Sequence, residues 1–168
     1  AINAAITYVN GLGGGEVELD AREYSLTGPI IKRSNVRLVG KGSDNTILKL
    51  ATNANSPVVK TLDYDTLIVA RNAVGPTDFA LVGLTLDGNR LNQSGSAADL
   101  NGISSYGWHF LIEDVTVQEC KGKGIRSDWE TLVGQDMAST FRRILIYNVG
   151  RDGFDISGPN DNHGEDII

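Results

Sequence analysis

The chain repeats a short pattern of alternating apolar residues, and this repetition restricts its fold more than any other feature. The first clear copy, FALVGLTLDGN, occupies residues 79–89 and leads into an Asp-Gly-Asn turn. Three later segments carry equivalent apolar residues, at Val115, Ile144 and Ile167. The copies follow one another at intervals of about 20 to 30 residues, which is typical of solenoid proteins. Because apolar residues alternate with a period of two, each copy is predicted to contain a β-strand.

A second pattern recurs between these copies and predicts a second strand in each unit. A glycine is followed by an apolar and then a polar residue at Gly102, Gly124 and Gly153. Loops of unequal length separate the two patterns, which a solenoid tolerates because each unit contacts only its neighbours. The sequence therefore predicts an all-β solenoid, a β-helix.

The N-terminal residues predict a cap for this solenoid. Apolar residues at helical spacing between Ile2 and Val9 predict a short α-helix, which the glycines at 13–15 would end. The terminal units of a solenoid need such a cap. We therefore divide the chain into a capping helix with a glycine-rich segment at residues 1–15 and β-helix rungs at residues 16–168.

Several segments depart from the regular period. Residues 58–62 and 67–70 are predicted as strands of an irregular rung whose loops project outwards. Polar residues at 90–99 and 129–139 predict loops inserted between strands. Residues 165–168 stop partway along a repeat, so we expect a β-helix truncated at its C-terminal end, the N-terminal part of a longer one.

Composition argues against several classes of function. A formal net charge of −6 without a basic cluster argues against a nucleic-acid surface. No apolar run approaches the roughly 18 residues of a membrane span. The single cysteine, Cys120, excludes an internal disulfide framework and is expected to be a small buried apolar residue. No zinc, phosphate-loop or triad spacing occurs, so we predict no metal or cofactor, with Ca²⁺ bound by loop carboxylates as a weaker alternative.

Two N-terminal segments resemble the pectate-lyase-like superfamily of single-stranded right-handed parallel β-helices. GGGEVELDAREYSL at residues 13–26 is similar to its usual first strand, and SNVRLVGKG at residues 34–42 to its first rung. The resemblance implies this fold for nearly the whole chain. The superfamily includes lyases, hydrolases, epimerases and non-catalytic binders, so the fold does not decide the reaction.

Two branches of the superfamily are similar to this chain. GRDGFDISGPNDNHGEDII at residues 150–168 resembles bacteriophage tailspikes and capsule depolymerases, and LTLDGNRLNQSG at residues 84–95 resembles mannuronan C-5 epimerase modules. The epimerases place a catalytic tyrosine and aspartate on a Gly-Tyr-Gly-Phe-Asp strand. Lys123 and Arg126 stand at those two places here, which counts against epimerase chemistry. The tailspike branch implies a homotrimer that is extracellular or part of a virion tail.

One column of side chains is the candidate site. Outward-pointing residues on successive rungs lie about 4.8 Å apart, so Ser104, Arg126 and Asp155 are expected to line one groove. Glycoside hydrolysis needs two carboxyl groups, roughly 5–5.5 Å apart for retention or about 6.5–9.5 Å for inversion. We therefore predict Asp128, Glu130 and Asp155 as the catalytic residues.

The predicted substrate-binding residues are Lys123, Arg126, Trp129 and His163. Cations pair with acidic sugars, and aromatic rings stack on sugar faces. Tyr106 and Trp108 are further stacking candidates, although packing beneath loops explains them equally well. A plain salt bridge between Arg126 and Asp155 is the alternative for that pair.

The sequence thus predicts a polysaccharide-binding and polysaccharide-degrading β-helix of tailspike or depolymerase type. One alternative is a uronan lyase or C-5 epimerase of alginate or pectin type. The other is a non-catalytic virion structural protein or adhesin.

Overall fold

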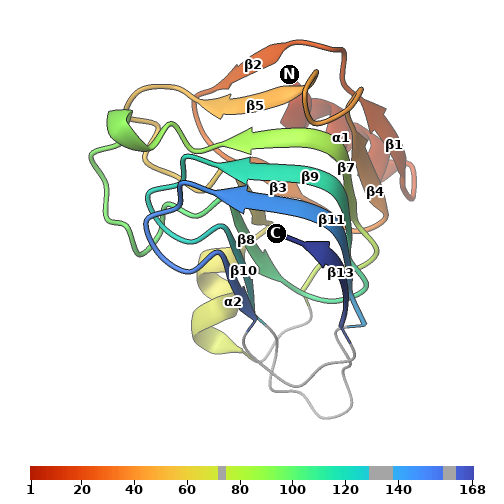
Figure 1. Cartoon of the computed structure of the whole chain (residues 1–168). Coiled ribbons are helices and arrows are strands. Elements are labelled where there is room, and N and C mark those ends of the chain that lie inside the picture. The colour runs from red at the N-terminus through yellow and green to blue at the C-terminus, as the bar shows by residue number, and fades with distance from the viewer. Residues whose placement is uncertain (72–74, 129–137, 157–161) are drawn as a thin grey trace.

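The computed structural model describes residues 1–71, 75–128, 138–156 and 162–168. Within these ranges the chain forms a right-handed parallel β-helix with an N-terminal helix, as the sequence predicts (Figure 1). Its strands form one eight-stranded and one five-stranded sheet, and every pairing between named strands is parallel. Each turn of the chain adds strands to both sheets.

The eight-stranded sheet has a main path and two additional strands. Its main path is β1 (Gly15–Glu18), β4 (Val36–Val39), β7 (Ala80–Asp87), β9 (Leu111–Gln118), β11 (Thr140–Tyr147) and β13 (His163–Ile167). The two additional strands are β2 (Glu23–Leu26) and β5 (Ile47–Leu50), which continue the sheet beside the second half of β7.

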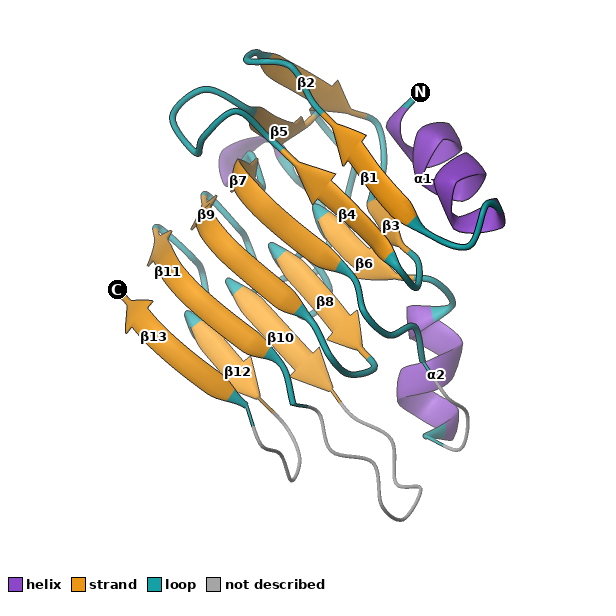
Figure 2. Ribbon diagram, turned by 90° about the vertical axis from the view of Figure 1, so that its right-hand side faces the viewer, coloured by secondary structure: helices purple, strands orange, loops and turns teal. Residues whose placement is uncertain are grey.

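The five-stranded sheet lies behind the first sheet in the view of Figure 2. Its strands in spatial order are β3 (Ile30–Lys32), β6 (Val59–Thr61), β8 (Ile103–Tyr106), β10 (Ile125–Asp128) and β12 (Phe154–Ile156). The strand predicted at residues 58–62 is therefore confirmed as β6.

The registers confirm the repeat on which the prediction rested. Leu84 pairs with Val115, Val115 with Ile144, and Ile144 with Ile167. In the other sheet, Ile103 pairs with Ile125, and Ile125 with Phe154. Apolar residues thus form ladders along the inside of the solenoid, which is how short strands with a period of two bury a continuous core.

A left-handed residue interrupts each long strand of the eight-stranded sheet. Gly83, Asp114, Arg143 and Asp166 occupy equivalent positions and have φ values of 63°, 52°, 52° and 52°. A non-glycine residue there costs roughly 1–2 kcal/mol. The long strands are curved in Figure 1, and a left-handed residue in mid-strand accounts for such a bend. The sequence pattern did not reveal this bend.

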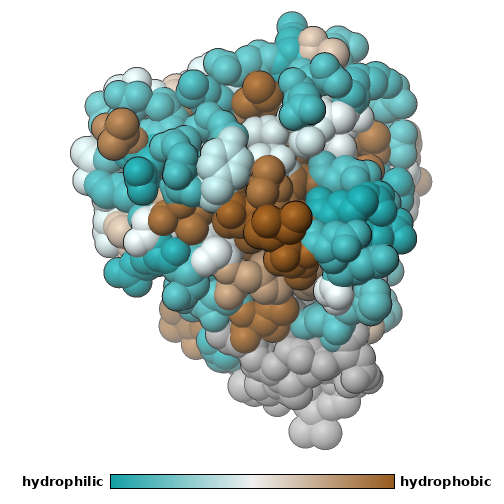
Figure 3. All heavy atoms as spheres, in the orientation of Figure 1, coloured by the Kyte–Doolittle hydropathy of each residue, from teal (hydrophilic) through white to brown (hydrophobic). Residues whose placement is uncertain are grey.

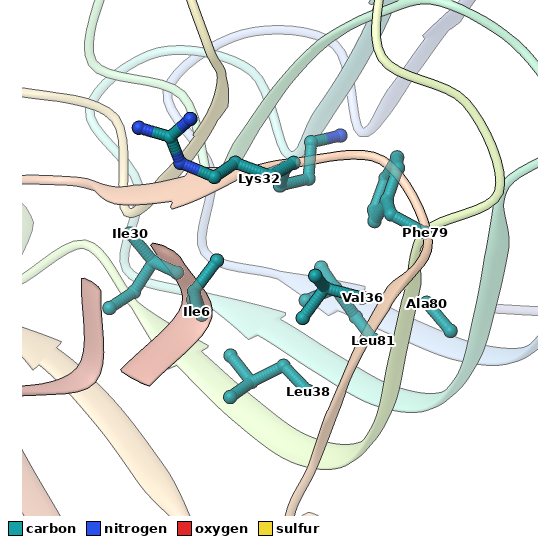
Figure 4. Close-up of a pocket in the computed structure, with 9 residues that line it drawn as sticks. Ile6, Ile30, Lys32, Val36, Leu38, Phe79, Ala80 and Leu81 are labelled. Atoms are coloured by element: carbon teal, nitrogen blue, oxygen red, sulfur yellow. The ribbon is translucent and has the colours of Figure 1, made fainter. Parts of the chain in front are cut away.

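The predicted N-terminal helix is confirmed as α1 (Ile2–Gly11). It packs beside β1, β3 and β4, and its Ile6 is 3% exposed. A cavity of about 10 Å³ lies between this helix and the first rungs, and Lys32 and Phe79 are among its lining residues (Figure 4). The helix therefore covers apolar residues of the first rung.

The strand predicted at residues 67–70 is wrong, because these residues belong to helix α2 (Tyr64–Ala70). Tyr64 and Leu67, one helical turn apart, pack with Tyr106 of β8 on the outside of the five-stranded sheet. Their spacing of three residues is that of a helix, and the short apolar run hid it. Neither this helix nor another in the described ranges is long and apolar enough to span a membrane.

The last rung exposes apolar side chains. Figure 3 shows hydrophobic atoms gathered in the middle of the face that carries the C-terminus. Ile167 is 41% exposed, whereas its register partner Ile144, one rung earlier, is buried.

Cys120 is buried in the core, as predicted. Burial raises the pKa of its thiol to about 12, so almost no thiolate forms at neutral pH. We expect no reaction of the native protein with a thiol-specific chromogenic reagent and one reactive thiol per chain in denaturant. Rapid labelling of the native protein would show that this part of the core opens readily.

Candidate functional site

The predicted column of outward-facing residues exists and is longer than the sequence indicated. The registers of the five-stranded sheet place Ser104 beside Arg126 and Arg126 beside Asp155. They extend the column through Lys60 of β6 to Ile31 of β3. Five strands at a spacing of about 4.8 Å give a column roughly 19 Å long.

Asp128, a predicted catalytic carboxylate, is enclosed within the protein. Its side chain is 0% exposed and accepts three donor groups. The phenol of Tyr64 donates to Oδ2 at 2.8 Å, Arg126 Nε donates to Oδ2 at 2.8 Å, and Arg71 Nη2 donates to Oδ1 at 3.3 Å. A carboxylate without exposed surface and with three donors around it is poorly placed to attack a sugar or transfer a proton to one.

Tyr64 reaches this carboxylate from α2. Burial raises the pKa of its phenol, and the charge of Asp128 and the hydrogen bond to it raise that pKa further. The phenol therefore stays protonated at neutral pH and acts as a donor. Figure 1 shows α2 beside β8 and β10, the two strands whose outer residues this cluster joins.

Lys123 and Asp155 form a second charged pair in the groove. The Lys123 ammonium contacts the carboxylate of Asp155 and lies 3.3 Å from that of Asp152. The hydrogen bond to Asp155 raises the pKa of Lys123, so the lysine stays charged at neutral pH. The alternative salt bridge between Arg126 and Asp155 is therefore not the pairing observed, because Arg126 binds Asp128 and Asp155 binds Lys123.

A pocket of about 270 Å³ opens between α2 and the column. Its lining residues are Pro57, Tyr64, Asp65, Ile68, Ala98, Asp99, Asn101, Ser104 and Arg126. Asn101 is buried, donates to Ser104 Oγ at 3.0 Å and accepts from the Lys123 backbone at 2.8 Å. The pocket thus combines hydroxyl, amide, carboxylate and guanidinium groups in one concave surface, the usual character of a ligand site.

The structure locates only one of the three remaining predicted residues. Glu130 and Trp129 lie outside the described residues. His163 is exposed on β13 of the eight-stranded sheet, with Nε2 at 3.8 Å from Glu165, so it does not belong to the column. His163 was expected near the column because it follows the loop after Asp155, but it belongs to a strand of the other sheet.

One of the two aromatic candidates near β8 is enclosed within the protein. Tyr106 is 0% exposed and packs beneath α2, so it offers no sugar platform. Trp108 forms an isolated parallel bridge with Thr77.

Sequence reasoning missed several residues of the site. Lys60, Tyr64 and Arg71 come from segments without a clear repeat, whereas Asn101 directly precedes Gly102 of the repeated pattern and was not considered as a site residue. Lys60 was detectable in principle, because it follows an apolar residue of a predicted strand as Ser104 and Arg126 do. Tyr64 and Arg71 belong to the helix that was mistaken for a strand.

The described residues contain no cluster of three or more histidine, cysteine or acidic side chains that could hold a metal ion. Several anionic groups of the groove are instead next to a cation. Lys60 pairs with Asp65 at 2.7 Å, Lys123 pairs with Asp155, and Arg126 pairs with Asp128. The column itself reads Lys60, Ser104, Arg126 and Asp155, so two cations flank a hydroxyl and one carboxylate follows.

Comparison with known proteins relates this architecture to enzymes that act on polysaccharides. No protein-family model matches the chain. It is 30% identical to mannuronan C5-epimerase AlgE2 and 26% identical to alginate lyase 7, both of Azotobacter vinelandii, across 100% of its own length. The chain spans only 18% and 21% of these two proteins, respectively.

Solved structures give the same relationship. The A-module of mannuronan C-5 epimerase AlgE4 from Azotobacter vinelandii matches 99% of this chain, with a TM-score of 0.69 and 25% identity. The match covers 45% of that structure. ORF18 of Geobacillus virus E2 matches with a TM-score of 0.55 and 17% identity, which supports a shared fold only. On sequence motifs alone the tailspikes rank above the epimerases as relatives, and the comparisons reverse this order. The chain is a β-helix related to alginate-epimerase and alginate-lyase modules.

Proposed function

We propose that the protein binds a polyuronate along the outer face of the five-stranded sheet and acts on it at C5 of the uronate ring. The observation that carries this proposal is the column Lys60–Ser104–Arg126–Asp155, which joins the charged pairs of the groove into one continuous floor. The similarity to mannuronan epimerases and an alginate lyase supports the same substrate class.

The charge pattern fits a uronate chain better than a densely anionic polymer. Cations recognise carboxylates, while aspartates and Ser104 can exchange hydrogen bonds with sugar hydroxyls. A polymer running across the strands meets a new strand about every 4.8 Å, close to the length of one pyranose unit. Lys60 and Arg126 lie two strands apart with Ser104 between them, so two cations can meet carboxylates of the polymer while Ser104 meets a hydroxyl between them.

Epimerisation and eliminative cleavage share their first step. A base removes the C5 proton, and a cation next to the sugar carboxylate stabilises the negative charge that develops. Protonation from the opposite face then inverts C5, whereas breaking the C4–O bond cleaves the chain and leaves an unsaturated uronide. We assign the charge-stabilising role to Lys123 and Arg126 and the proton-accepting role to Asp155, whose side chain is 25% exposed.

The proposal is tested by incubating the protein with alginate and pectin in heavy water. We expect either deuterium at C5, detected by NMR, or an unsaturated product whose C5 carries no hydrogen, and an Asp155→Asn variant should lose about 10²–10⁴-fold in rate. Rising near-ultraviolet absorbance would identify a lyase, and exchange without cleavage an epimerase. The matched control is Asp44→Asn, an exposed carboxylate outside the groove.

Other outcomes would contradict the proposal. Shortened chains without deuterium or ultraviolet absorbance would indicate a hydrolase, and the panel should include capsular and O-antigen polysaccharides for that reason. Binding without any change in the polymer would indicate a non-catalytic binder. An extracellular location and a homotrimer remain predictions, the latter tested by analytical ultracentrifugation.

A further inference from the structure

The guanidinium of Arg126 in the groove is held by a buried carboxylate of its own strand. Arg126 lies in the middle of the column, between Ser104 and Asp155, and lines the pocket beside α2. Its side chain is 27% exposed. It therefore contacts both the protein interior and the open groove.

A buried carboxylate determines how this guanidinium is held. Asp128 accepts from Arg126 Nε at 2.8 Å and from Nη2 at 3.3 Å, while its own surface is fully enclosed. A guanidinium has five N–H donors in one plane, so two contacts on one edge fix that plane and leave the other donors available. The arrangement presents a pre-organised donor edge to the pocket.

The neighbouring carboxylate does not occupy these donors. Asp155 is the register partner of Arg126 on the next strand, yet its side chain is held by Lys123. Asp152 lies next to the same lysine. Because Lys123 binds Asp155, this carboxylate of β12 does not occupy the remaining donors of Arg126.

The position of Asp128 is itself maintained from outside the sheet. Tyr64 donates to Oδ2, and Arg71 donates to Oδ1. Burying a carboxylate with its cation usually contributes little to stability relative to an apolar pair. Because Arg126 of this ion pair also lines the pocket, we interpret Asp128 as a residue that orients the Arg126 guanidinium.

We propose that Arg126 recognises a carboxylate of the bound polysaccharide and that Asp128 is the positioning residue that holds Arg126 for this contact. This inference rests on the proposed function and assigns to Asp128 a role other than catalysis. Arg126 determines specificity for an acidic over a neutral sugar. Asp128 does not touch the polymer.

The test compares binding of an alginate oligosaccharide with binding of the same oligosaccharide after its carboxyl groups are reduced. Arg126→Gln should weaken binding of the acidic ligand by roughly 10- to 100-fold, because hydrogen bonds to charged groups are lost. Binding of the reduced ligand should change by less than about twofold. Arg37→Gln is the matched control, an arginine paired with Glu16 on the other sheet, and should change neither.

Two further variants test whether the position of the Arg126 guanidinium matters in addition to its charge. Thermal unfolding then controls for effects on folding. Arg126→Lys keeps the positive charge but cannot make both contacts to Asp128, so it should also lose preference for the acidic ligand. Asp128→Asn should lower that preference in the same direction, although residue 128 is out of reach of the ligand. Thermal unfolding of each variant shows whether it is folded, and the ratio of the two affinities is independent of the folded fraction.

The outcomes distinguish this inference from the function on which it rests. If the native protein binds neither ligand, both fail. If the native protein prefers the acidic ligand and Arg126→Gln retains that preference, the function stands and Arg126 is structural. If Arg126→Gln loses the preference and Asp128→Asn keeps it, Asp128 has no positioning role.

Discussion

Replacing Gly102 by alanine should lower the free energy of unfolding by about 3 kcal/mol, near the upper end of typical overpacking costs. A Cβ atom at this position would lie 2.2 Å from Cγ1 of Val117 and 2.6 Å from the carbonyl oxygen of Gly124. Val117 is a core residue of the other sheet, and Gly124 belongs to the next rung. Neither contact can be relieved by turning a flexible side chain, so the rungs must separate.

The control for this prediction is Gly28→Ala. A Cβ at Gly28 has nothing within 4 Å, so a small change of less than about 1 kcal/mol is expected. Chemical denaturation of both variants gives the comparison. If Gly102→Ala unfolded at the same denaturant concentration as the native protein, the close stacking of rungs at this glycine would be wrong.

Replacing Lys32 by methionine should raise the free energy of unfolding by about 1–3 kcal/mol, the typical cost of an imperfectly compensated buried polar group. The side chain is 3% exposed, and Nζ lies 3.6 Å from the centre of the Phe79 ring and 4.7 Å from that of Phe110. Its hydrogen bond goes to Ser105 Oγ at 2.8 Å, and no ion pair joins it to a carboxylate in the described ranges.

The same substitution should alter the dependence of stability on pH. Burial holds the pKa of Lys32 well below its ordinary value, whereas the unfolded chain titrates near 10.4. Between these two values the unfolded state binds a proton that the folded state does not, so this group makes the protein more stable as pH rises. The gain from Lys32→Met should therefore be larger at about pH 7 than at about pH 9.5.

Urea unfolding at the two pH values measures this difference. Lys49→Met, which changes a partly exposed lysine of β5, is the matched control and should show no comparable shift with pH. An equal gain at both pH values would mean that the amine of Lys32 does not change its protonation on folding in this range.

The β-helix could be predicted because the core-forming strands carry apolar residues at repeated positions in the sequence. Leu84, Val115 and Ile144 share a column because each must point inwards at the same place in its rung. The bend at Asp114 and Arg143 could not be predicted in this way, since a left-handed residue in mid-strand leaves the apolar alternation almost unchanged.

The candidate site was only partly predictable for a related reason. The column of Ser104, Arg126 and Asp155 follows from strand alignment, and the structure has it. The burial of Asp128 depends on α2, which lies outside the repeat and places Tyr64 over the strand. A motif gives the direction of a side chain along its own strand, but not what packs over it from a segment far away in the sequence.

The most direct test of the account is to record backbone amide NMR spectra of this 18.0 kDa chain during titration with an alginate oligosaccharide. We predict that the amides of Lys60, Ser104, Lys123, Arg126 and Asp155 shift together, with little change on the outer face of the eight-stranded sheet. Shifts confined to that other sheet, or no shifts at a saturating ligand concentration, would contradict the claim that the five-stranded face binds a uronate polysaccharide.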